Sequence, residues 1–105
     1  MTSIISGVQT SFWRQLPLHF VGLSPMDGVT DVPFRTITKK YGKPDLMFTE
    51  FSSVEGLCRG AVELMREFRY TEAQRPLVAQ IYGTTPEFFR QMAVVLCQLG
   101  FDGID

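Results

Sequence analysis

Apolar residues follow two alternating patterns along the chain. Short apolar runs typical of buried strands occur at four places, residues 18–24, 45–50, 76–82 and from 101 onwards. Between them, apolar residues recur at helical spacing over residues 31–42, 52–68 and 85–100. A chain that alternates in this way is predicted to form parallel strands covered by helices.

Capping residues mark where the helices begin and end. Asp31 is suited to cap the first helix, and Gly42 is predicted to end it in the left-handed position after the last turn. Ser52 with Glu55 matches a capping box at the start of the second helix. Thr85, which precedes a proline, is predicted to cap the third.

Two architectures share this alternation, the (β/α)₈ barrel and the open doubly wound sheet. The pattern alone does not separate them. A barrel needs roughly 200 residues or more, so under that interpretation these 105 residues supply less than half of one. We then expect a lead-in over residues 1–17 and a partial barrel domain over residues 18–105, truncated at its fourth strand, with unpaired sheet edges.

Charge and cysteine content narrow the class of protein. The formal net charge is −1, with acidic and basic residues interspersed, so no basic stripe indicates a self-sufficient nucleic-acid binder. Cys58, Cys97 and the single His19 are unclustered, which argues against a disulfide framework and a zinc site. The start of the chain lacks signal-peptide features, and no apolar run reaches the roughly 20 residues that span a bilayer. We expect a soluble, cytoplasmic protein without a metal.

Candidate chemistry lies just past the strands, because both architectures place their active sites at the carboxyl ends of strands. The loop at residues 24–28 is either a plain turn or a surface whose backbone groups meet the edge of a flat heterocycle. Glu50 is a carboxylate at a strand end, and is either a site residue, a solvated loop residue or the partner of a helix dipole. Gln80 is an amide in an apolar strand, and needs a partner in a ligand or a neighbouring strand.

Other reactive residue types are expected to be structural. Cys58 and Cys97 fall on the apolar stripes of predicted helices, where a thiol acts as a small hydrophobe. His19 is expected to be structural or on the surface. The sequence holds no P-loop, no dinucleotide-binding glycine motif and no nucleophile elbow.

Four stretches in the same order carry a family resemblance. Residues 23–35, LSPMDGVTDVPFR, closely resemble the signature that opens the tRNA-dihydrouridine synthases. Residues 46–52 (LMFTEFS) and 76–83 (PLVAQIYG) resemble the family's second and third strands, and residues 100–105 (GFDGID) resemble its fourth. Four ordered matches are more specific than any single one.

This resemblance implies an FMN-binding (β/α)₈ TIM barrel of which the first three and a half βα units are present. Pro25, Met26 and Asp27 would contact FMN largely through their backbone, and Gln80 would hydrogen-bond the isoalloxazine ring. Asp27 departs from the small residue or glutamate usual in the family, which weakens a side-chain role for it. The family's catalytic cysteine belongs to the loop after the fourth strand, beyond Asp105, so no catalytic residue is assigned here.

The implied reaction is reduction of the C5–C6 bond of particular uridines in tRNA, with NADPH reducing FMN and the flavin then passing a hydride to the flipped base. The tRNA would be held largely by a later helical domain, in a monomeric enzyme. One alternative is another FMN barrel, such as a dihydroorotate or dihydropyrimidine dehydrogenase, although residues 28–31 and 33–35 argue against it. The other alternative is a catalytically silent fragment.

Overall fold

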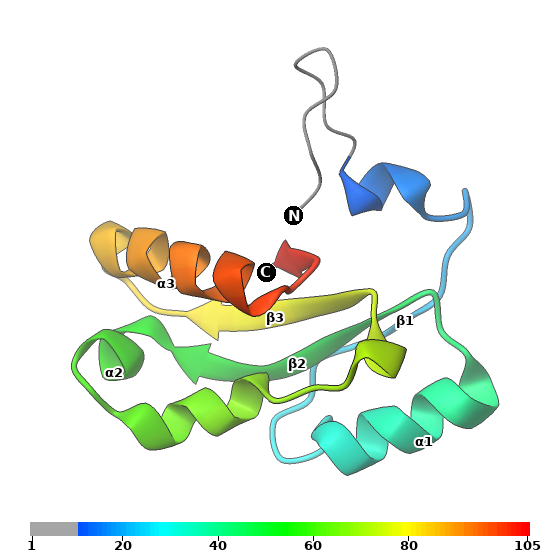
Figure 1. Ribbon diagram of the computed structural model, residues 1–105, viewed down its shortest axis with the longest axis horizontal. Helices are drawn as coiled ribbons and strands as arrows, with labels where there is room; N and C mark the ends of the chain where they lie inside the picture. Colours follow the sequence, from blue (N-terminus) through cyan, green and yellow to red (C-terminus); the bar gives the residue numbers. More distant parts are fainter. Residues whose placement is uncertain (1–10) are drawn as a thin grey trace.

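The computed structural model describes residues 11–105, which form a four-stranded parallel sheet with helices between the strands (Figure 1). The strands are β1 (Gly22–Leu23), β2 (Leu46–Ser53), β3 (Leu77–Tyr82) and β4 (Gly103–Ile104). Most of the predicted lead-in, residues 1–10, lies outside the described residues, so its boundary stays a prediction.

Three α-helices and three short 3₁₀ helices complete the described part of the chain. The α-helices are α1 (Val32–Gly42), α2 (Val54–Cys58) and α3 (Pro86–Leu99). The 3₁₀ helices are η1 (Phe12–Gln15), η2 (Val62–Phe68) and η3 (Glu72–Gln74). The predicted α/β alternation is confirmed.

Strand order separates the two architectures that the sequence left open. The strands lie in the order β1-β2-β3-β4 with no reversal, and the arrows of β2 and β3 point the same way in Figure 1. A doubly wound sheet reverses its order at a switch point, whereas a barrel adds each strand beside the previous one. The short dimension of 21 Å also fits two layers, one sheet and one layer of helices. The arrangement is that of a partial (β/α)₈ barrel.

The core lies between the sheet and the helices that follow β2 and β3. Its buried apolar members are Val54, Phe68, Ala79, Ile81, Met92 and Leu96. On β3, Ala79 and Ile81 face this core, so the alternate residues Gln80 and Tyr82 face the other side of the sheet. That second side, the inner face, remains partly open, and Tyr82 is half exposed there.

The second helix differs most from its prediction. Instead of one helix over residues 52–68, α2 ends at Cys58, Gly60 adopts a left-handed φ of 95°, and the chain continues as η2. Glycine takes this conformation without strain, so the helix breaks there. The predicted capping box is also wrong, because Ser53 and not Ser52 caps the helix and accepts the Gly56 N–H at 3.2 Å. Glu55 instead accepts the N–H groups at the start of the next βα turn.

The first strand is shorter than predicted, since residues 18–21 lie before it. Within the described residues β1 pairs only with β2, so one side of this strand has no ladder to extend it. Helix α1 is capped by Asp31 as predicted, but continues through Gly42, and Lys43 takes the left-handed position instead. The Lys43 N–H closes the last turn on the Thr38 carbonyl at 3.2 Å.

Helix α3 begins and ends where it was predicted to. Thr85 occupies the N-cap position, but its side chain makes no capping hydrogen bond, and its N–H donates to Glu55 instead. Proline follows in the first turn, and Gly100 ends the helix with a left-handed φ of 95°. Cys97 was expected on the apolar stripe but is exposed, because the buried face of α3 runs through Met92 and Leu96.

Candidate functional site at the carboxyl ends of the strands

The loop after β1 is a closed turn between Met26 and Thr30. The N–H groups of Val29 and Thr30 both donate to the Met26 carbonyl at 3.0 Å. The buried Thr30 hydroxyl accepts the Met26 N–H at 3.1 Å and lies 3.2 Å from the Met26 carbonyl oxygen. Both backbone groups of Met26 are therefore used inside the turn, and its side chain, 38% exposed, is what it presents outwards.

Several backbone groups of this loop remain available to a ligand. Among the described residues, the carbonyls of Pro25, Asp27 and Gly28 and the Asp27 N–H have no hydrogen-bond partner. The Gly28 N–H is occupied, because it donates to the Glu50 carboxylate at 2.6 Å. The loop thus offers acceptors and a donor, which is a pattern that suits the polar edge of a heterocycle.

Gln80 lies on the inner face, two strands away from β1. Its backbone N–H donates to the Thr49 hydroxyl at 3.0 Å, and its side-chain Nε2 donates to Asp105 at 2.8 Å. The amide is half-buried, and its Oε1 has no partner among the described residues. The predicted partner is found for the side-chain nitrogen of Gln80, which donates to Asp105 directly after the neighbouring strand β4. The side-chain oxygen of Gln80 remains available as an acceptor among the described residues.

Aromatic side chains flank Gln80 on the same face. Phe51 is in register with Gln80, and the Phe51 and Tyr82 rings pack edge to face with centroids 5.1 Å apart. Phe51 is 40% exposed and Tyr82 is 50% exposed. Exposed aromatic faces beside a free amide oxygen can bind a flat ring.

Strand register brings the loop and Gln80 to the same end of the sheet. Leu23 pairs with Met47, which pairs with Leu77, so the loop starts from the level at which β3 begins and rises beside it. Two strand spacings separate β1 from β3, a distance of about 10 Å. The predicted cofactor residues thus lie at the same end of the sheet, and Glu50 of β2, the strand between them, is hydrogen-bonded to the loop.

A buried guanidinium supports the loop from below. Arg35, 1% exposed, donates to the Thr30 carbonyl at 2.5 Å, to Gln74 Oε1 at 3.1 Å and to the Arg69 carbonyl at 2.6 Å. Gln74 in turn donates to the Thr36 hydroxyl at 3.0 Å. Burial lowers the pKa of Arg35, and the nearby carboxylates oppose that shift. The network joins the end of the loop to the segment after η2.

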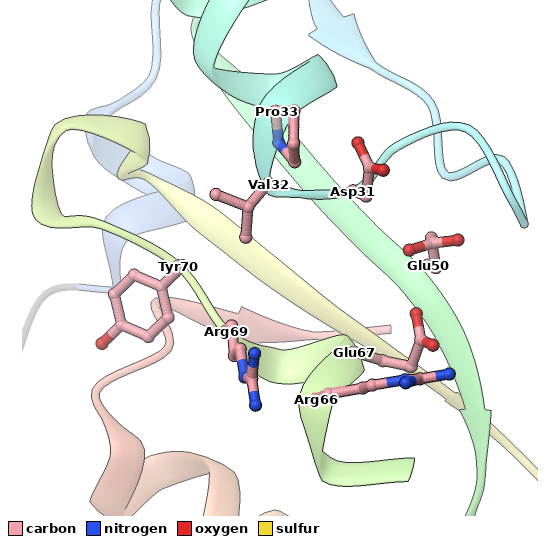
Figure 2. A pocket seen from close by; sticks show the side chains of 8 residues that line it. All are labelled: Asp31, Val32, Pro33, Glu50, Arg66, Glu67, Arg69 and Tyr70. Carbon is pink, nitrogen blue, oxygen red and sulfur yellow. The ribbon is translucent and has the colours of Figure 1, made fainter. Parts of the chain in front are cut away.

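A second hollow lies on the helix side of the sheet, between the start of α1, Glu50 and the end of η2 (Figure 2). This outer cleft has a volume of about 550 Å³ and is lined by Asp31, Val32, Pro33, Glu50, Arg66, Glu67, Arg69 and Tyr70. The carboxyl groups of Glu50 and Glu67 point toward one another in Figure 2. Burial, followed by the hydrogen bond and charge of Glu50, raises the pKa of Glu67 to about 6.

The remaining candidates from the sequence lie away from the inner face. His19 is exposed, as expected. Cys58 is half-buried, packs against the core and lies 3.7 Å from the Phe88 carbonyl oxygen. In residues 11–105, no three His, Cys, Asp or Glu side chains gather as a metal site. No helix in this described range has the length and apolar character needed to cross a bilayer.

Sequence reasoning missed the residues that shape the loop and the inner face. Thr30 and Arg35 act through partners far along the chain, which no local pattern reveals. Phe51 and Tyr82 could have been found, because residues two apart on a strand share a face and Tyr82 follows Gln80 at that interval.

Comparison with known proteins decides the family. Residues 22–105 match the family described as dihydrouridine synthase (Dus). The chain belongs to the dihydrouridine synthase family. The resemblance of the four sequence stretches is thereby confirmed, and the matched range covers all four strands of the sheet.

Named relatives agree with this family. The chain is similar to the "Probable tRNA-dihydrouridine synthase 2" of Bacillus subtilis (strain 168), with 43% identity over 97 residues, covering 90% of this chain and 30% of the relative. It is similar to the "Probable tRNA-dihydrouridine synthase" of Staphylococcus aureus (strain COL), with 38% identity over 100 residues, covering 93% of this chain and 30% of the relative. The chain thus spans about 30% of the length of these dihydrouridine synthase relatives.

Proposed function

We propose that this chain contributes the first βα units of a flavin-dependent tRNA-dihydrouridine synthase, which reduces the C5–C6 bond of specific uridines in tRNA with NAD(P)H as reductant. The observation that carries the proposal is that the Met26–Thr30 turn and Gln80 lie at the same end of the sheet, in a chain of this family. The family match favours this activity over that of other FMN barrels acting on the same bond.

The residues of this chain fit the polar edge of FMN. In the proposal, the Pro25 carbonyl and the Asp27 N–H meet the ring system, the exposed Met26 side chain packs against it, and Gln80 Oε1 accepts a ring N–H. Phe51 and Tyr82 add apolar surface that excludes water. When bound, FMN supplies hydride transfer, and the protein supplies position and electrostatics.

The proton donor for C5 is not assigned to a residue of this chain. Cys58 packs in the helix layer and Cys97 is exposed on α3, so neither thiol borders the inner face. We propose, from the family resemblance, that a cysteine in the loop after β4 has this role. The uridine and its tRNA would be held mainly by regions beyond β4, in a monomeric cytoplasmic enzyme.

Flavin binding provides the test. The chain, extended to the length of its relatives, is titrated with FMN by absorbance and fluorescence, and NADPH consumption and dihydrouridine formation in tRNA are then measured. We expect FMN binding and both activities. Gln80→Leu is expected to weaken FMN binding about tenfold, whereas Gln98→Leu, at an exposed position of α3, leaves it unchanged. An extended protein that binds no flavin would contradict the proposal.

A further inference from the structure

We propose that Glu50 is a positioning residue, which fixes the cofactor loop by accepting the Gly28 N–H and does not itself touch the cofactor. The inference rests on the proposed function for the identity of the cofactor. The sequence assigns no hydrogen bond to Glu50, whereas in the structure its carboxylate accepts the N–H of Gly28 in the cofactor loop.

The cofactor loop is fastened to the sheet through one hydrogen bond of its tip. The turn is closed internally by the Thr30 hydroxyl and the Met26 carbonyl, so its shape is set, but those bonds do not fasten its tip to the sheet. Gly28 lies at that tip, and its bond to Glu50 spans 22 residues of sequence at 2.6 Å. The bond to a carboxylate is charge-assisted and stronger than a neutral one. It therefore sets how the Pro25 and Asp27 groups face the inner face.

Glu50 points away from the inner face. The register of β2 against β3 shifts between Phe48 and Phe51, so the direction of Glu50 is taken from the cleft that it lines and not from strand alternation. Glu50 lines the outer cleft, beside Glu67 and the start of α1 (Figure 2), whereas the Phe51 ring packs against Tyr82 on the inner face. A ligand on the inner face would meet Phe51 and not the Glu50 carboxylate.

The strand that carries Glu50 limits its movement. Glu50 lies on β2, which pairs with a strand on each side in the described sheet. The carboxyl group of Glu67, on η2, faces that of Glu50 across the outer cleft (Figure 2). The Glu50 carboxylate is thus held on a paired strand, as a positioning group requires.

The test compares Glu50→Ala, Glu50→Gln and the matched control Glu63→Ala, whose glutamate is exposed on η2. Each is made in the chain extended to the length of its relatives. Hydrogen exchange of the Gly28 amide and the FMN dissociation constant are measured, with the melting temperature as a check on folding. We expect Glu50→Ala to raise the exchange rate and to weaken FMN binding about tenfold. Glu50→Gln keeps an acceptor oxygen and should retain most of both.

Three results separate the possibilities. If the Gly28 amide of Glu50→Ala exchanges hydrogen at the rate of the control, and the variant binds FMN as tightly as the control, the positioning role is refuted. If Glu50→Gln is as impaired as Glu50→Ala, the hydrogen bond is not the cause and the inference fails. If the parent protein binds no FMN, the proposed function fails, while the Gly28 exchange rates still decide whether Glu50 fastens the loop.

Discussion

Replacement of Arg35 by methionine tests the buried network beneath the loop. The guanidinium makes three hydrogen bonds, to the Thr30 and Arg69 carbonyls and to Gln74. A hydrogen bond to a charged group contributes about 1.5–3 kcal/mol, but Arg35→Met also relieves the cost of burying the charge. We expect the free energy of unfolding to fall by about 3 kcal/mol, because two buried acceptors and one partly buried acceptor lose their donor.

Equilibrium urea denaturation of the relative-length protein measures this loss. Lys40→Met, on the exposed side of the same helix, is the matched control and should stay within about 0.5 kcal/mol of the parent. A double-mutant cycle between Arg35→Met and Gln74→Leu should give a coupling of about 1 kcal/mol, since the two side chains are in contact. An Arg35→Met variant as stable as the control, or a coupling near zero, would refute the assigned network.

Two further predictions concern stability. Gly83→Ala should cost about 1–3 kcal/mol in urea denaturation, because the added methyl group would collide with Glu55 and Val54, whereas Gly42→Ala meets no atom within 4 Å and should be neutral or slightly stabilising; equal effects would contradict this. Burial and the neighbouring Glu50 raise the pKa of Glu67 from its ordinary 4.5 to about 6, while Asp27 adds to the shift and Arg66 opposes it. Glu67 therefore keeps its proton to a higher pH in the folded protein than in the unfolded chain. The free energy of unfolding should therefore fall by about 1 kcal/mol as pH rises from 4 to 7, and Glu67→Gln should remove that part of the fall; an identical pH profile for the parent and Glu67→Gln would contradict the assignment.

The sequence pattern alone predicted those elements whose structure depends mainly on their own residues. The core-facing alternation of β3 and the Thr85 to Gly100 helix follow from periodicity and end signals. The second helix failed because a continuous apolar stripe concealed a break at Gly60, which a stripe alone cannot reveal. The Ser53 cap was missed by one residue, because β2 continues to that residue through its pairing with β3.

The candidate site likewise contains residues that the sequence pattern could place and residues that only tertiary structure reveals. The positions of Pro25, Met26, Asp27 and Gln80 at the strand ends follow from the order of the elements, while their roles toward FMN stay predictions. The Arg35 network was out of reach, because Arg35 and Gln74 are 39 residues apart and their contact depends on how α1 packs against η3. The bond between Glu50 and Gly28 likewise needs tertiary structure to be seen.

The consecutive strand order has a consequence for how the chain acquires its structure during synthesis. Each of β2, β3 and β4 pairs with the strand immediately before it, through a crossover of one βα unit. Every strand among these four therefore pairs with a segment that is synthesised before it, and no ladder in this part of the sheet waits for a later segment. Because each pairing spans only one βα unit of sequence, the entropic cost of bringing the two strands together stays small.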